Sequence, residues 1–103
     1  MKTQLVRLAH ARSGDKGDKA NIAIFAPDQA TYDLLARAVT AERVREHFVG
    51  IITGYVERFE VPNVLGLNFV LHGALNGGAS KSLRSDALGK SFSSALLRME
   101  IEV

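Results

Sequence analysis

Cysteine is absent from this chain of 103 residues. Its absence excludes a disulfide framework, a thiolate metal site and a cysteine nucleophile, and it fits a reducing compartment. The apolar run near the N-terminus is short and is broken by Arg7, so it does not read as a signal peptide. No run approaches the ~18 apolar residues that a membrane-spanning helix needs. We therefore expect a cytoplasmic protein that does not associate with membranes.

A strong charge of one sign is lacking as well. The chain holds 13 Lys and Arg against 11 Asp and Glu, a net charge of +2, and has no Lys/Arg run, so nucleic-acid binding is not indicated. The histidines His10, His47 and His72 lack metal-binding spacing, so we expect no metal and no cofactor. With 47% hydrophobic and 23% charged residues, the composition is that of one globular domain spanning residues 1–103.

Apolar runs and helix caps predict an α+β fold. Asp28 and Thr40 are suitable N-caps for two helices, and the alternation of residues 97–103 is typical of a half-exposed strand. The simplest packing is a ferredoxin-like two-layer sandwich, with a four-stranded, mostly antiparallel sheet and helices on one face. We expect strands at residues 5–9, 22–26, 52–60 and 97–103, and helices at 28–39, 40–48, 64–75 and 91–95.

The stretch SGDKGDK, residues 13–19, is longer and more ionic than a strand connection needs. Glycines let backbone N–H groups converge on an anion, and the lysines add charge. The alternative is an ordinary loop whose aspartates bond their own backbone and whose lysines are solvated. We predict a ligand- or partner-binding loop. The candidate residues are Arg12, Ser13, Gly14, Asp15, Lys16, Gly17, Asp18 and Asn21.

A second polar stretch, GGASKSLRSDALGK, covers residues 77–90. The guanidinium of Arg84 could bind a carboxylate or phosphate through two hydrogen bonds, whereas Asp86 is more simply a helix cap. The sequence around Lys90 resembles the end of a phosphate-binding P-loop, but Arg84 stands where its first glycine belongs, which excludes nucleotide hydrolysis. The candidate residues are Gly77, Gly78, Ser82, Arg84, Asp86 and Lys90.

Two further residues are candidates for the same site. Asn68 places a carboxamide in an expected apolar helix, where it either bonds a neighbouring backbone or contacts a ligand. His10 precedes the first polar stretch and could line the site, whereas the other histidines read as structural. Gly14 to Gly17 match the GXXG pattern of KH RNA-binding domains, but strands rather than helices flank them, so this signal is weak.

Three segments together resemble a known family. RSGDKGDKANIAIFA, LGLNFVLHGALNGG and SLRSDALGK are similar to the C-terminal domain of acyclic-terpene-utilisation (AtuA-like) proteins, from about Leu8 to Val103. The resemblance implies a ferredoxin-like fold and a link to terpenoid acyl-CoA breakdown. Family members usually carry a long N-terminal region, so it also implies a separate subunit that joins a larger chain. The matching residues are Arg12, Ser13, Gly14, Asp15, Lys16, Gly17, Asp18, Asn21, Asn68, Phe69, Gly77, Gly78, Ser82, Leu83, Arg84, Asp86, Gly89 and Lys90.

The leading functional hypothesis is an accessory or ligand-binding subunit. It would form a homo-oligomer or join a larger chain, and its two polar stretches would meet to bind an anionic metabolite. A second hypothesis is an enzyme half-site acting on an acyl-CoA or another anion, with Asp15 or Asp18 as base and Lys16 or Arg84 holding the anion. A nucleic-acid-binding module ranks last.

Overall fold

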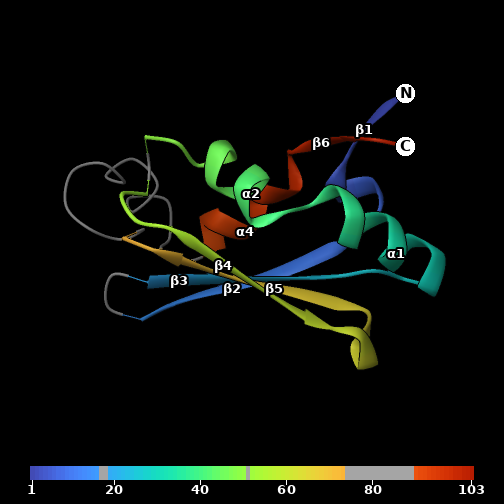
Figure 1. Ribbon diagram of the computed structural model, residues 1–103, viewed down its shortest axis with the longest axis horizontal. Helices are drawn as coiled ribbons and strands as arrows, with labels where there is room; N and C mark the ends of the chain where they lie inside the picture. The colour runs from blue at the N-terminus through green and yellow to red at the C-terminus, as the bar shows by residue number, and fades with distance from the viewer. Residues whose placement is uncertain (17–18, 51, 74–89) are drawn as a thin grey trace.

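A four-stranded antiparallel sheet forms one layer of the molecule, and helices lie against one of its faces (Figure 1). The computed structural model describes residues 1–16, 19–50, 52–73 and 90–103, with only the backbone of Asp15, Lys16, Lys90 and Ser91. The sheet has the order β2-β3-β5-β4. These strands are β2 His10–Lys16, β3 Lys19–Phe25, β5 Gly66–His72 and β4 Val56–Val61. The α+β class, the four-stranded antiparallel sheet and the one-sided helices are as predicted.

The second layer holds the helices and the paired ends of the chain. A two-stranded antiparallel ladder joins β1 to β6, with Thr3 opposite Ile101. The helices are α1 Gln29–Ala38, α2 Ala41–His47 and α4 Lys90–Leu97, the short strands are β1 Lys2–Gln4 and β6 Glu100–Glu102, and the 3-10 helices are η1 Leu5–Arg7 and η2 Pro62–Val64.

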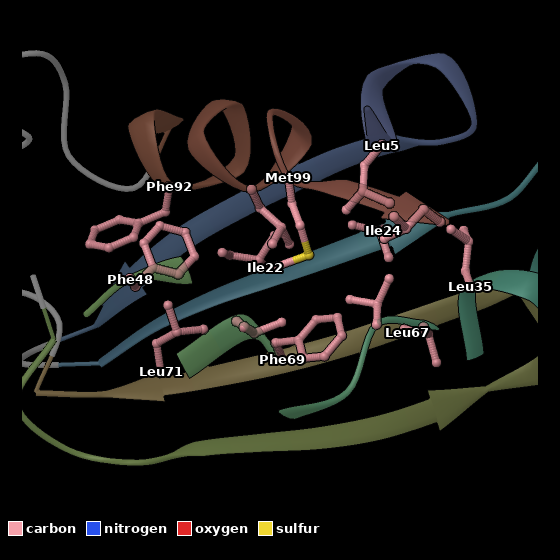
Figure 2. Close-up of a cluster of buried hydrophobic side chains, with 14 of the residues drawn as sticks. Leu5, Ile22, Ile24, Leu35, Phe48, Leu67, Phe69, Leu71, Phe92 and Met99 are labelled. Atoms are coloured by element: carbon pink, nitrogen blue, oxygen red, sulfur yellow. The ribbon is translucent and has the colours of Figure 1, made fainter. Parts of the chain in front are cut away.

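The core lies between the sheet and the helices (Figure 2). Successive strand residues point to opposite faces, and every second residue of β3 and β5 is buried. Each large apolar side chain that is fully buried stabilises the fold by about 1.5–3 kcal/mol relative to an exposed one. From the sheet come Ile22, Ile24, Leu67, Phe69 and Leu71, and from the other layer Leu5, Leu35, Phe48, Phe92 and Met99.

The predicted helix starts are confirmed. A side-chain oxygen of Asp28 accepts a hydrogen bond from the backbone N–H of Thr31 at 2.8 Å, and Thr40 Oγ1 accepts one from the N–H of Arg43 at 3.1 Å. These bonds satisfy donors that a helix leaves without an internal partner. The short helix expected near residues 91–95 is also present, as α4.

The predicted helix over residues 64–75 is wrong. Leu65 takes a left-handed conformation with φ of 55°, and residues 66–72 form β5, in the middle of the sheet. Alternate burial of Leu67, Phe69 and Leu71 suits a strand that turns one face to the core. Asn68 is therefore a strand residue, and the expected element order with a helix at this place does not hold.

Three other boundaries differ from the predictions. Residues 5–7 form a 3-10 helix rather than a strand, and Leu5 fills the core from it. The C-terminal strand is limited to β6, because α4 continues through Leu97. The strand expected at 52–60 begins only at Val56.

The stretch expected to be a loop at residues 13–19 is mostly paired strand. The register continues from Ser13 opposite Ile22 to Lys16 opposite Lys19. The backbone pairing of β2 and β3 therefore continues through these polar residues, since strand pairing uses backbone groups and does not require apolar side chains.

Candidate functional site

The sheet has one face turned away from the helices, which we name the open face (Figure 1). Strand alternation and cross-strand pairing assign residues to it, since directly paired residues lie on the same face. Its members are His10, Arg12, Gly14, Lys19, Asn21, Ala23, Phe25, Glu57, Phe59, Val61, Gly66, Asn68, Val70 and His72.

Two rows of paired residues cross this face. One runs Arg12, Ala23, Asn68, Phe59, and the next runs Gly14, Asn21, Val70, Glu57. The structure therefore brings Arg12, Gly14, Asn21 and Asn68, all predicted site residues, onto one face from three strands. A Cβ built on Gly14 would lie 3.4 Å from Oδ1 of Asn21, so the Asn21 carboxamide lies against this glycine.

The cations of the open face have no acidic partner among the described side chains. Arg12 and Lys19 are exposed and make no ion pair there. The carboxylate of Glu57 instead faces His72, with Oε1 at 2.7 Å from Nε2. Among the described side chains, the half of the face on β2 and β3 therefore carries positive charge without an acidic partner.

His72 is held from several sides. Its ring stacks on Tyr55 with centroids 4.1 Å apart and an angle of 14°, and it is 18% exposed. The His72 N–H donates to the carbonyl of Tyr55, and the His72 carbonyl accepts from the N–H of Gly54. A Cβ on Gly54 would come within 2.6 Å of that carbonyl oxygen, so only glycine fits. Sequence reasoning missed the Glu57–His72 pair, because 15 positions separate its members and only the register brings them together.

His10, which the sequence suggested could line the site, lies on the open face two positions along β2 from Arg12. Its ring stacks on Phe25 at 5.3 Å between centroids. The Phe25 ring in turn covers Gly66, where an added Cβ would be 3.2 Å from ring carbons. His47 has the structural role expected of it, with Nε2 at 2.7 Å from the carbonyl oxygen of Ala95.

Ser13 lies on the helix-covered face rather than the open one. Its Oγ accepts a hydrogen bond from the backbone N–H of Ser93 at 3.2 Å. This contact joins β2 to α4, which begins at Lys90, the last residue of the second polar stretch. The two stretches are thus linked through the elements that flank them.

For the remaining predicted site residues the structure describes no side chain. Asp15 and Lys16 are described as strand backbone only, in register with Ala20 and Lys19, and Lys90 as the first backbone residue of α4. Convergence of the two polar stretches on one site stays a prediction. Gly17, Asp18, Gly77, Gly78, Ser82, Arg84 and Asp86 lie outside the described residues.

We also searched the described part of the chain for a pocket, a metal site and a membrane-spanning helix. A hollow of about 340 Å³ lies beside α2, and its described lining residues, Glu42, Arg45, Glu46, Val49 and Ile52, do not belong to the polar stretches. The described residues include no group of three or more His, Cys, Asp or Glu that could hold a metal ion. Within the same residues, no helix has both the length and the apolar character to span a membrane.

Comparison with known proteins gives a family match over almost the whole chain. The model of the AtuA ferredoxin-like domain matches residues 3–102. Searches of curated proteins and of solved structures gave no significant match. Of the motif residues that carry the resemblance, Arg12, Asn21 and Asn68 lie on three adjoining strands. The chain belongs to the AtuA ferredoxin-like domain family.

Proposed function

We propose that this protein is a small ligand-binding or accessory subunit that binds an anionic metabolite on its open face. The observation that carries the proposal is that Arg12, Asn21 and Asn68 lie on this face in adjoining rows, with Lys19 further along β3 on the same face. An arginine and a lysine supply charge-assisted hydrogen bonds to a carboxylate or phosphate. Carboxamides supply both donors and acceptors for the rest of a ligand. In the full proposal, residues 13–19 and 77–90 contribute to the same site.

The charge distribution on the sheet supports an anion rather than a cation. Glu57 is the acidic residue among the described members of the open face, and its carboxylate already faces His72. Neither Arg12 nor Lys19 has an ion-pair partner among the described side chains, so an incoming anion would displace none of these carboxylates. The attraction of exposed charges weakens as salt rises, which makes it measurable.

Calorimetric titration with pyrophosphate and with coenzyme A tests this proposal. We expect both to bind, more weakly in 0.2 M than in 0.02 M salt, and Arg12→Ala to weaken both about tenfold by removing charge-assisted hydrogen bonds. Arg37→Ala is the matched control, because Arg37 is an exposed arginine on α1, in the helical layer. Absence of binding by the unmodified protein at millimolar ligand would contradict the proposal, as would an equal effect of the two substitutions.

We also propose that the protein works as a homo-oligomer or with a larger partner chain. Exposed apolar side chains support this, because such groups gain free energy when a second surface covers them. Val61 and Val64 are 39% and 55% exposed at the η2 end of β4. A role in terpenoid or acyl-CoA breakdown and a cytoplasmic location complete the proposal, and both rest on the resemblance and composition.

A further inference from the structure

We propose that the ligand of the open face is an adenine nucleotide, bound along the row Phe59, Asn68, Ala23, Arg12. This inference rests on the proposed anion site and names the chemical class of its ligand. The row places an aromatic ring, a carboxamide, a small side chain and a guanidinium in that order across four strands. A nucleotide presents a base, a sugar and phosphate groups in the same order.

The aromatic end of the row offers a stacking surface. Phe59 is 47% exposed, and it lies on the edge strand β4 rather than in the core. Its ring makes no aromatic contact with the other described rings. Exposed aromatic rings on an antiparallel sheet can stack on nucleobases, because every base has a flat π-face.

The carboxamide of Asn68 is positioned next to that ring. Asn68 is directly opposite Phe59 on the adjoining strand and is half-buried. Its side chain makes no hydrogen bond to the rest of the described chain, so its donor and acceptor are available to a ligand. An asparagine carboxamide pairs with the amino group and ring nitrogen of adenine through two hydrogen bonds.

The cationic end determines the direction of the ligand. Arg12 lies on β2, three inter-strand spacings or about 14 Å from β4. Ala23 lies between Arg12 and Asn68 and leaves space above the sheet. Phosphates at the β4 end would approach the carboxylate of Glu57, whereas at the β2 end they meet Arg12. Lys19 lies on the same face but outside this row, about 13 Å along β3 from Ala23. The base therefore belongs over β4 and the phosphates over β2.

Calorimetry on the full chain tests this with six probes: ADP, GDP, pyrophosphate, adenosine, coenzyme A and an oligoadenylate of eight nucleotides. We expect ADP to bind about tenfold more tightly than pyrophosphate or adenosine, because it engages both ends of the row. We expect a similar preference for ADP over GDP, because guanine lacks the adenine amino group that Asn68 would bind. Coenzyme A also carries adenine and phosphates. Tighter binding of ADP than of coenzyme A identifies the ligand as a free nucleotide, and the reverse order identifies it as an acyl carrier.

Substitutions separate the two ends of the row. Phe59→Leu should weaken ADP about tenfold and leave pyrophosphate unchanged, and Asn68→Leu should abolish the preference for ADP over GDP. Tyr55→Leu is the matched control, since Tyr55 is 58% exposed but lies outside the row, and it should leave ADP affinity unchanged. Circular dichroism verifies that each variant is folded.

The outcomes distinguish this inference from the proposed function. Equal affinity for ADP and pyrophosphate would overturn the assignment of a nucleotide ligand but would leave the proposed anion site standing. Equal losses from Phe59→Leu and Tyr55→Leu overturn the assignment to this row. If an oligoadenylate of eight nucleotides binds much more tightly than ADP, the inference of a mononucleotide is wrong and the ligand is a single-stranded polynucleotide. Binding of none of these probes contradicts both proposals.

Discussion

Arg58 is a charged residue on the helix-covered face of the sheet, paired in register with the buried Phe69. Its Nη1 donates hydrogen bonds to the carbonyl oxygens of Ala36 at 2.8 Å and Val39 at 3.2 Å, and its Nη2 lies 2.6 Å from Oε2 of Glu60. The last carbonyls of a helix have no partner within the helix. Arg58 therefore completes the C-terminal end of α1 from a strand of the other layer.

Replacing this arginine should destabilise the protein. We expect Arg58→Met to lower the free energy of unfolding by about 2 kcal/mol, because it removes charged hydrogen bonds and leaves two carbonyls without their donor. Urea denaturation measures the change. Arg98→Met is the control, because Arg98 is exposed and its side chain makes no hydrogen bond within the described residues, so a change below about 0.5 kcal/mol is expected. Equal effects would show that Arg58 does not cap α1.

At the scale of the element, the start of α1 depends on an ionised side chain. Hydrogen bonds from the side chain and the backbone of Thr31 hold the pKa of Asp28 below its ordinary value of 3.8. A carboxyl whose pKa is lower in the folded than in the unfolded state stabilises the fold above the unfolded pKa. That contribution disappears as the pH falls through the folded pKa.

Asp28→Asn should isolate this contribution. Asparagine caps helices about as well as aspartate but does not titrate, so we expect the unfolding midpoint in urea to fall less steeply for the variant between pH 4 and pH 2. Thr40→Ala at the start of α2 is the comparison: it should lower stability by about 1 kcal/mol at every pH, because its cap carries no titrating group. Identical acid profiles for Asp28→Asn and the unmodified protein would contradict the prediction.

Features encoded within a few residues could be predicted from the sequence, and features set by distant partners could not. The caps at Asp28 and Thr40 bond residues three positions away, so the sequence displays them directly. By contrast, the run that forms β5 suits a buried helix as well as a buried strand, and pairing with β3 and β4 decides between them. Alternation of Leu67, Phe69 and Leu71 was the available signal for a strand.

The candidate site shows the same division. Arg12, Asn21 and Asn68 could be selected as polar residues in unusual places. Their position on one face follows only from the register, because a shift of one residue turns a side chain to the other face. Phe59 and the pair Glu57–His72 carry no motif and were found only through the structure.

At the scale of the whole molecule, exposed apolar side chains lead to a testable prediction about the oligomeric state. Val61 and Val64 expose apolar surface together at one end of the sheet. We expect multi-angle light scattering at 1–5 mg/mL to give twice the monomer mass, and Val64→Asp to return the protein to a monomer, because a buried unpaired charge opposes association. Val49→Asp is the control, since Val49 is 79% exposed beside α2. A monomer at all concentrations would contradict the homo-oligomer.

The ladder between β1 and β6 has a mechanical consequence. Because Lys2 is opposite Glu102 and the Val103 N–H donates to the carbonyl of Met1, both ends of the chain leave from one point (Figure 1). Anything attached to either end, or to both, would be tethered at that point in the helical layer. The open face, on the other side of the sheet, would then stay accessible to a ligand or a neighbouring protein.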